Sequence, residues 1–346
     1  MSDRPHRIVV LYNTDYDAEL TAGTGSDVSA VAASAQAVAD ALAARGYVAE
    51  LAGLHGLELF DLIDRLRGAR PDLVFNLCES MAGDPRNEVA IPAVFDLYGI
   101  PYTGSDALAL GQALFKVRTK DVLHGRGVST PPHRLLRTPD DLDEAAVGEI
   151  DYPWFLKLAH EDASVGIEAD NLVRDRAALV RRARTMMEEW KQPVLAERYV
   201  EGREINVTLI GNSWDLQMLP LHEIDFSAMP PERPRIVSYA AKWDEAHVDY
   251  AGTKPVPLVG ATPQLIAAVE RTARAAWDAV GLRDYGRVDL RVDAAGRPWV
   301  IDVNPNCDIS PDAGVARAAK VAGLDYPGLI ERIALVAWRR LRGGRS

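Results

Sequence analysis

The segment GRVDLRVDAAGRPWVIDVNPN, near the C-terminus, carries oxygen-bearing side chains at regular spacing. We expect two strands joined by a tight turn, with Arg287 and Asp289 on the first strand and Asp302 and Asn304 on the second. Because residues two apart in a strand share a face, two carboxylates and an amide oxygen converge beside a guanidinium. Such oxygen ligands suit Mg²⁺, which completes its octahedron with water and substrate phosphates. An ion pair across a surface hairpin is the alternative, and we favour the metal site.

Lysine is rare in this chain, supplying only seven of the 39 basic residues. Lys157 lies in WFLKLAHEDASVGI, where an apolar strand ends and a loop of small residues begins. A buried ammonium group is costly unless it meets an anion, and lysine is a good point-charge partner for phosphate. Ala163, Ser164 and Gly166 allow backbone N–H groups to approach phosphate oxygens closely. The segment is a candidate phosphate site, although a Gly/Ser loop alone is weak support.

Two glutamates lie at the ends of neighbouring predicted strands in VLAERYVEGREINVTLI. One strand ends at Glu197, and Glu204 begins the next. Carboxylates at the edge of a cleft accept hydrogen bonds from an exocyclic amine or from ribose hydroxyls. Taken alone, the same pattern also fits two solvated glutamates near a turn.

The first 115 residues alternate apolar strands with helices, which predicts a parallel sheet covered by helices. The expected strands are 7–11, 47–51 and 72–77, and the expected helices are 27–45, 57–67 and 89–98. Ligands of such sheets collect at the carboxyl ends of the strands. The resulting candidates for substrate recognition are Glu79, Arg86 and Glu88 after the third strand, and Asp17 and Glu19 after the first.

The pattern changes after residue 115. The expected strands are 133–136, 154–158, 194–198, 285–292 and 298–303, and the expected helices are 116–124, 175–190, 262–280 and two that close the chain. Gly211-Asn212, between two alternating apolar segments of 204–221, predicts a hairpin. The Pro-rich stretch 233–259 is expected to be loop or edge. His222, in LPLHEIDF, is a candidate for the entrance of a site near Lys242.

Composition limits the classes of partner. The chain has 346 residues, enough for two or three units, with 39 Lys plus Arg against 50 Asp plus Glu and a net charge of −11. Nucleic acids and anionic membranes attract basic surfaces, so this balance argues against both as main partners. A phosphate ligand remains compatible, since local cations and a metal ion can hold it.

Cysteine usage and the N-terminus indicate a cytoplasmic protein. Cys78 and Cys307 are the only cysteines, and their separation fits neither a metal motif nor a disulfide framework. The short apolar run IVVLY predicts a strand and is too short for a secretory signal. No stretch reaches the roughly 18 apolar residues that a membrane helix requires.

The order of these segments resembles the ATP-grasp superfamily, and specifically its D-alanine–D-alanine ligase branch. IPYTGSDALALGQALFKVRTKDVL resembles the segment that leads into the first ATP-binding lysine, and FLKLAHEDASVGI the second lysine with its glycine-rich loop. LAERYVEGREINV resembles the stretch that contacts adenine and ribose, and SYAAKW the lysine motif of the mobile loop. GRVDL with VIDVNPN resembles the magnesium and catalytic segment. The resemblance covers roughly residues 7–332.

The resemblance implies a role for each matching residue. Lys116 and Lys157 would contact the ATP phosphates, and the loop of Ser164 would cover them. Glu197 and the backbone of Val200 would face adenine, and Glu204 would face the ribose. Two Mg²⁺ ions, or Mn²⁺ in their place, would be held by Asp289, Asp302 and Asn304. Lys242 would neutralise the transferring phosphoryl group, and Arg287 the oxyanion of the tetrahedral intermediate.

The implied architecture is an α/β fold, α+β in part, namely an ATP-grasp fold with an N-terminal parallel-sheet domain. Its units would be an N-terminal substrate-capping domain (1–115), a central lid (116–203) and a C-terminal catalytic domain (204–346). The implied reaction joins a small-molecule carboxylate to an amine through an acyl phosphate. The implied assembly is a homodimer.

Three departures from the family pattern point to substrates other than two D-alanines. Ala163 stands where those ligases carry the first of two loop serines, and Trp243 replaces a tyrosine. NPNCDISPDAG, with Cys307, Asp308 and Ser310, replaces the loop for the second substrate. NLCESMAGDPRNE replaces the His-Gly…Gly-Glu-Asp-Gly loop, and Asp302 is shorter than the usual glutamate.

The predicted function is therefore an ATP-dependent carboxylate–amine ligase with a different amino acid or small-acid pair. A small-molecule kinase, a ligase that extends a mycosporine-type acceptor and a non-catalytic nucleotide-binding regulator are the alternatives. A kinase would not need Arg287 to face an oxyanion, and a regulator would not need Lys242, Arg287 and both metal carboxylates.

Overall fold

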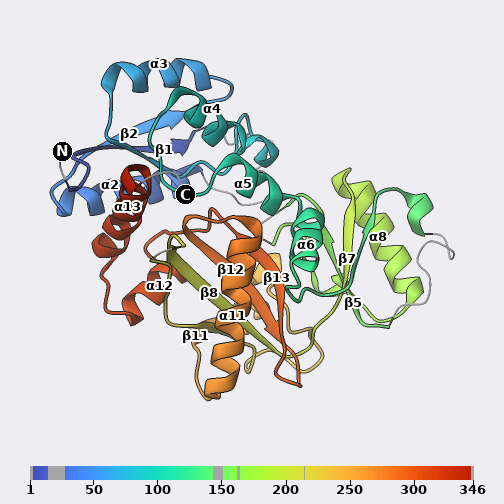
Figure 1. The fold of residues 1–346 in the computed structure, drawn as a ribbon. Coiled ribbons are helices and arrows are strands. Elements are labelled where there is room, and N and C mark those ends of the chain that lie inside the picture. Colours follow the sequence, from blue (N-terminus) through green and yellow to red (C-terminus); the bar gives the residue numbers. More distant parts are fainter. Residues whose placement is uncertain (1–2, 15–27, 143–150, 162–163, 214, 344–346) are drawn as a thin grey trace.

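The computed structural model describes residues 3–14, 28–142, 151–161, 164–213 and 215–343. Asp17, Glu19 and Ala163 of the sequence predictions lie outside these ranges. Three sheets, each covered by helices, follow one another along the chain (Figure 1). They correspond to the N-terminal, central and C-terminal parts of the sequence, as the mixture of parallel and antiparallel patterns predicts.

The N-terminal sheet is parallel, with the strand order β2-β1-β3. Its elements are β1 (Arg7–Asn13), α2 (Val28–Ala44), β2 (Val48–Leu54), α3 (Leu59–Ala69), β3 (Leu73–Asn76), a 3₁₀ turn (Pro85–Asn87) and α4 (Ala90–Tyr98). All four residues of β3 are buried, although β3 lies at the end of the strand order, and Val74 on this strand forms an isolated parallel bridge with Tyr102. The alternation of strands and helices was therefore predicted correctly.

The central sheet is antiparallel, with the order β4-β7-β5-β6. Its elements are β4 (His133–Leu136), 3₁₀ turns (Pro139–Leu142 and Ala169–Asn171), β5 (Trp154–Leu158), β6 (Leu172–Val173), α8 (Arg176–Trp190) and β7 (Val194–Arg198). Helix α8 begins after Asp175, whose side chain accepts a hydrogen bond from the backbone N–H of Ala178. Leu179, Ala183 and Met186 of this helix pack on the sheet.

The C-terminal sheet has the order β11-β10-β8-β12-β13, with β9 paired to β8. Its strands are β8 (Arg203–Gly211), β9 (Gln217–Met218), β10 (His222–Asp225), β11 (Lys254–Pro257), β12 (Asp284–Val292) and β13 (Pro298–Asn304). The helices are α5 (Ala107–Leu114), α6 (Lys116–Gly125), α9 (Tyr239–Trp243), α10 (Val248–Ala251), α11 (Pro263–Val280), α12 (Gly314–Val321) and α13 (Tyr326–Gly343). Helices α6 and α11 share a hydrophobic core with β12 and β13.

Two details of the sequence prediction need correction. The hairpin after β8 has no two-residue turn at Gly211-Asn212, because β8 and β9 pair only through Leu209–Met218 and Ile210–Gln217. The stretch 233–259 contains the edge strand β11 but also the short helices α9 and α10. Ser238 begins α9 by accepting a hydrogen bond from the N–H of Ala241, a capping signal in SYAAKW that the proline content obscured.

The C-terminal helix α13 packs beside α2 of the N-terminal unit (Figure 1). Ile330, Ile333 and Ala337 share one buried cluster with Val38 and Leu42. The end of the chain therefore completes the core of its beginning, which joins the N-terminal and C-terminal sheets through a common apolar layer.

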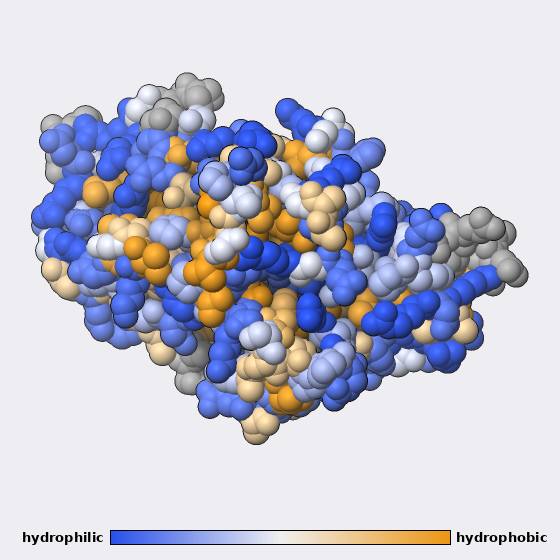
Figure 2. Space-filling view, turned by 90° about the horizontal axis from the view of Figure 1, so that it is seen from below, coloured by the Kyte–Doolittle hydropathy of each residue, from blue (hydrophilic) through white to orange (hydrophobic). Residues whose placement is uncertain are grey.

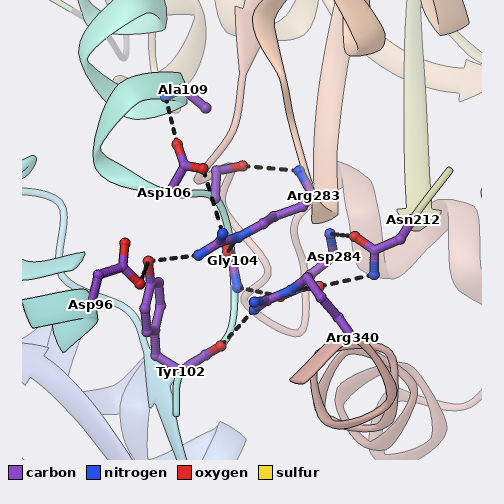
Figure 3. A network of polar contacts seen from close by, with 10 residues as sticks. Asp96, Tyr102, Gly104, Asp106, Ala109, Asn212, Arg283, Asp284 and Arg340 are labelled. Atoms are coloured by element: carbon purple, nitrogen blue, oxygen red, sulfur yellow. Dashed lines mark hydrogen bonds and ion pairs between the residues drawn. The ribbon is translucent and has the colours of Figure 1, made fainter. Parts of the chain in front are cut away.

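A polar junction reinforces this contact where β12 begins (Figure 3). Asp284 is fully buried and accepts from the backbone N–H of Gly104 at 2.9 Å and from Asn212 Nδ2 at 3.1 Å. Arg340 of α13 donates to both carboxylate oxygens, at 2.9 and 2.8 Å. Three segments far apart in the sequence therefore meet at one carboxylate.

The face of the molecule seen from below is mixed in character. Figure 2 shows apolar side chains gathered near the middle of the face seen from below, while the lobe at the right is mainly hydrophilic. In the described part of the chain, no helix combines the length and the apolar character needed to cross a bilayer.

Candidate active site

The hairpin of β12 and β13 brings the predicted metal and catalytic residues together. In its register Arg287 lies opposite Asn304, and Asp289 lies opposite Asp302. A bulge follows Asp289, so the pairing shifts by one residue between this pair and the turn. The spacing in the sequence therefore predicted both the face and the strand pairing.

Asp289 is the centre of a hydrogen-bond cluster. Arg287 Nε donates to Oδ1 at 2.7 Å and Nη2 to Oδ2 at 2.8 Å, a bidentate pair. Asn206 Nδ2 on β8 donates to Oδ1 at 2.7 Å, and Asn304 Nδ2 to Oδ2 at 3.1 Å. Burial disfavours the charged guanidinium, but Asp289 outweighs it and raises the pKa of Arg287. The pair keeps the Arg287 guanidinium protonated and in a fixed orientation on this face.

Asp302 faces the first predicted ATP lysine. Lys116 Nζ lies 3.5 Å from Asp302 Oδ2, and the lysine is buried. Burial disfavours the carboxylate, yet the ammonium charges of Lys116 and Lys157 hold the pKa of Asp302 below its usual value. A small cavity between α6 and β13 is lined by Lys116, Thr119, Lys120, Leu123, Val300, Ile301 and Asp302.

The residues of this hairpin fit a magnesium site of the kind that shares its ligands with phosphates. Two opposed carboxylates, those of Asp289 and Asp302, and the amide oxygen of Asn304 are hard oxygen donors. Among the described residues, no three His, Cys, Asp or Glu side chains cluster as a metal cage. Mg²⁺ commonly retains waters and substrate oxygens with few protein carboxylates, so this sparse donor set is compatible with it.

Glu197 is buried between two lysines of different elements. Lys157 Nζ on β5 lies 2.6 Å from Oε1, and Lys120 Nζ on α6 lies 2.6 Å from Oε2. Burial raises the pKa of Glu197, but the two ammonium groups outweigh it and lower the value to about 2. Burial lowers the pKa of Lys120, which Glu197 partly opposes. Both carboxylate oxygens therefore face ammonium groups.

Glu204 lies on the same side of the sheet as Asp289. Its closest cation is Arg291, whose Nε lies 3.8 Å from Oε2. Burial raises the pKa of Glu204, an effect that Arg291 and, more weakly, Lys242 oppose. Val200, next to this group, is 8% exposed. The two residues predicted to contact ribose and adenine thus lie at a shielded part of the fold.

The loop after β5 contacts the segment that carries Lys242. Ser164, at a φ of 64°, donates from Oγ to the carbonyl of Val237 at 3.0 Å. The N–H of Tyr239 donates to the carbonyl of Ile167 at 2.9 Å. Helix α9, with Lys242 in its last turn, is therefore attached to the predicted phosphate loop.

The predicted substrate residues of the N-terminal unit lie on the loop after β3. Asn306 Nδ2 donates to Glu88 Oε1 and to the carbonyl of Cys78, each at 2.8 Å, so this loop contacts the one after β13. Glu79 is exposed, and Arg86 forms a bidentate pair with Asp84 on its own loop.

The other predicted substrate residues separate into two environments. Asp308 is exposed and accepts from the N–H of Ser310 at 2.8 Å, and Ser310 Oγ donates to Asp312 at 3.2 Å. His222 is 6% exposed within β10, and its Nδ1 lies 3.0 Å from the carbonyl of Pro220. Its ring is part of the sheet packing, which does not support its predicted place at a site entrance.

Sequence reasoning missed four residues of this region, and signals for three of them were present. Lys120 lies one helical turn after Lys116, on the same face. Asn206 lies two residues after Glu204, and Arg291 lies four residues after Arg287. Each therefore shares a strand face with a predicted site residue. Asn306 carried no local signal, because its partners are distant in the sequence: Cys78 and Glu88 of the N-terminal unit and Tyr285 of β12.

The three sheets and the convergent lysines and carboxylates define an ATP-grasp arrangement. A family model described as D-ala D-ala ligase C-terminus matches residues 125–335. The chain therefore belongs to the D-alanine–D-alanine ligase family of ATP-grasp proteins, and it is an ATP-dependent ligase that forms carbon–nitrogen bonds.

Individual relatives and structures agree with this assignment. The chain is 33% identical over 271 residues to the uncharacterized protein y4sG of Sinorhizobium fredii, covering 78% of this chain and 76% of that protein. It is 31% identical over 334 residues to a D-alanine–D-alanine ligase of Chromohalobacter salexigens, covering 96% and 95%. The ATP complex of a D-alanine–D-alanine ligase from Bacillus anthracis has the same fold, with a TM-score of 0.75, 21% identity and coverage of 98% and 99%.

Proposed function

We propose that this protein activates a small-molecule carboxylate as an acyl phosphate and joins it to an amine, with a substrate pair other than two D-alanines. The observation that carries the ligase chemistry is the hairpin pair: Asp289, clamped by Arg287, lies opposite Asp302. One face thus holds a fixed guanidinium beside two carboxylates, which suits phosphoryl transfer followed by collapse of an oxyanion.

The nucleotide end of the proposed site contains the lysines. Lys116 and Lys157 bind the ATP phosphates, Ser164 lies in the loop that covers them, and Lys242 neutralises the phosphoryl group during transfer. Glu197 and the backbone of Val200 face adenine, and Glu204 faces the ribose. The burial of Lys116 and Lys157 supports this arrangement, because phosphate charge compensates ammonium groups that water does not reach.

The metal end of the proposed site contains Asp289, Asp302 and Asn304. Bound there, two Mg²⁺ ions, or Mn²⁺, supply Lewis-acid neutralisation of phosphate charge. The protein's own contribution is orientation: the Arg287–Asp289 pair fixes one carboxylate, and the β12–β13 register places the second opposite it. Arg287 then stabilises the oxyanion that forms when the amine attacks the acyl phosphate.

The substrate end supports a pair different from two D-alanines. Asp308 gives the loop after β13 an exposed carboxylate, held by the N–H of Ser310. Glu88 is fixed by Asn306 on the facing loop, and Glu79 directly follows Cys78, whose carbonyl accepts from the same Asn306 side chain. Glu79, Arg86, Glu88, Asp308 and Ser310 are the candidates for recognition of the carboxylate and amine substrates. A homodimer remains a prediction from the family resemblance.

The test is incubation of the purified protein with Mg-ATP and pools of amino acids and small acids, with assays of ADP and of new product masses. We expect substrate-dependent ADP release and a product equal in mass to the two reactants minus water. D-alanine alone should give little product. A stable phosphorylated product would instead indicate a kinase, and ATP binding without turnover would indicate a regulator. Efficient synthesis of D-alanyl-D-alanine would contradict the proposed substrate difference.

A further inference from the structure

The buried group of Lys120, Glu197 and Lys157 contains more positive than negative charge. The two carboxylate oxygens of Glu197 each lie 2.6 Å from one ammonium nitrogen. Glu197 and Lys157 alone would form a neutral pair, and Lys120 adds a second cation. Because an unmatched buried charge is unfavourable, the group needs a further anion for its stability.

A second ion pair lies beside this group and adds one charge of each sign, since Lys116 Nζ lies 3.5 Å from Asp302 Oδ2. The Lys157 side chain is 11% exposed, against 3% for Lys120, so the excess charge is accessible from the Lys157 side. Lys120 is therefore too deep to be the residue that meets a ligand directly.

Lys120 is held on its other side by a link to the strand of the metal carboxylate. Its Nζ donates to Thr130 Oγ1 at 3.1 Å, and Thr130 Oγ1 donates to the carbonyl of Val300 at 2.9 Å. Val300 lies on β13, two residues before Asp302. The link therefore joins the lysines of α6 and β5 to the strand of Asp302 through buried polar atoms.

We infer that Lys120 is a positioning residue of the nucleotide site. It shares the Glu197 carboxylate with Lys157, and Lys157 therefore stays available to a triphosphate. Without Lys120, Glu197 would neutralise Lys157 completely, and the phosphates would compete with an internal carboxylate for that ammonium group. With Lys120 present, the Glu197 carboxylate interacts with two ammonium groups, and the excess positive charge is accessible to a ligand at Lys157. The inference rests on the proposed ATP role of Lys157.

The test is the affinity of the whole protein for Mg-ATP, measured by titration calorimetry, with adenosine as a ligand that has no phosphate. We expect Lys120→Met to raise the Kd for Mg-ATP about tenfold or more and to leave that for adenosine nearly unchanged. If Lys120 only stabilised the fold, its substitution would weaken the binding of both ligands or of neither. Equal affinities of Lys120→Met and wild type for Mg-ATP would overturn the inference.

A double variant tests the proposed sharing directly. Adding Glu197→Gln to Lys120→Met removes the carboxylate that captures Lys157. Because Glu197 is also proposed to face adenine, the readout is the ratio of the Kd for Mg-ATP to the Kd for adenosine, which should fall back toward the wild-type ratio. A ratio that stays as high as in Lys120→Met would refute the sharing. Thr130→Val keeps all charges but removes the link to Val300, and we expect a smaller rise in the Kd for Mg-ATP. If Lys120→Met does not fold, Thr130→Val supplies the test. An unchanged Kd for Mg-ATP in Thr130→Val would then count against the inference.

The wild-type protein separates this inference from the proposed function. If wild type does not bind Mg-ATP, the proposed nucleotide site and the role of Lys120 are both wrong. If wild type binds Mg-ATP and Lys120→Met binds it equally well, only the role of Lys120 is wrong.

Discussion

Arg340, near the end of the last helix, forms a bidentate ion pair with the fully buried Asp284 at the start of β12, the predicted catalytic strand. Asp284 has a φ of 67°, a left-handed conformation that aspartate tolerates better than most residues. It lies three residues before Arg287 and also accepts from the N–H of Gly104 (Figure 3). The position of the catalytic strand is thus fixed against both the N-terminal unit and α13.

The Asp284–Arg340 pair should contribute strongly to stability. Asp284→Asn keeps a side chain that tolerates a positive φ but leaves the Arg340 guanidinium buried without its anion. We expect a loss of about 3 kcal/mol in the free energy of unfolding, measured by urea titration. Arg339→Ala, which breaks the exposed pair with Asp215, is the matched control and should cost less than about 1 kcal/mol. Similar losses in the two variants would contradict the importance of the buried pair.

The buried Glu197 predicts a specific dependence of stability on pH. Its pKa in the folded protein is about 2, below the ordinary 4.5, so its contribution is complete above pH 4.5 and is lost as the pH falls toward 2. The difference in unfolding free energy between wild type and Glu197→Gln should therefore shrink over this range. Glu188→Gln, on the exposed face of α8, should show no such trend. A difference that stays constant down to pH 2 would argue against the lysine-bound carboxylate.

Asp302 should be required for turnover but not for folding. Asp302→Asn removes a predicted metal carboxylate, and we expect substrate-dependent ADP release to fall at least about 100-fold. Chelation with EDTA should abolish the wild-type activity, and added Mg²⁺ should restore it. Asp278→Asn, an exposed carboxylate on α11, is the control and should retain activity. Full activity of Asp302→Asn would show that the metal assignment is wrong.

Asn306 should couple the loop after β13 to the N-terminal unit. Its side chain donates to Cys78 and Glu88 and accepts from the Tyr285 hydroxyl at 2.8 Å. Asn306→Ala leaves these partners unsatisfied, so we expect a loss of about 1–3 kcal/mol in unfolding free energy and a higher KM for the carboxylate or amine substrate. The KM for ATP should change little.

Asn87→Ala is the matched control for this prediction. Asn87 makes only the local bond to the carbonyl of Met81 within its own loop, at 3.2 Å. Its loss should lower stability less and leave the substrate KM nearly unchanged. An effect of Asn306→Ala on the KM for ATP alone would indicate that Asn306 acts on the nucleotide end of the site.

Much of the fold was predictable because its signals are local. The parallel strands of the first unit, the helix 175–190 and the β12–β13 hairpin follow from hydrophobic periodicity and from capping and turn residues, which act over a few neighbours. The pairing of these two strands was predictable for the same reason, but the opposition of Asp289 and Asp302 was not, because a bulge after Asp289 shifts the register by one residue. Helices α5, α9 and α10 were missed because each is eight residues or shorter, too short for a clear period.

The partners of charged side chains were less predictable. Glu197 was expected to face adenine, but no local pattern indicated that Lys120 and Lys157 would both contact its carboxylate. Lys120 and Glu197 are separated by most of the central unit, and their contact depends on how α6 lies against β7. Short-range patterns identify which residues are unusual and leave their long-range partners undetermined.

The sequence by itself determined the longer helices, most of the strands, the family and the hairpin that carries Arg287, Asp289, Asp302 and Asn304, because periodicity and turn chemistry act between near neighbours. The tertiary structure alone decided that Arg340 neutralises Asp284, that Asn306 contacts Glu88 and that one buried glutamate serves two lysines. These contacts arise from packing between distant segments, where burial removes water and makes each charge depend on the partner that the fold supplies.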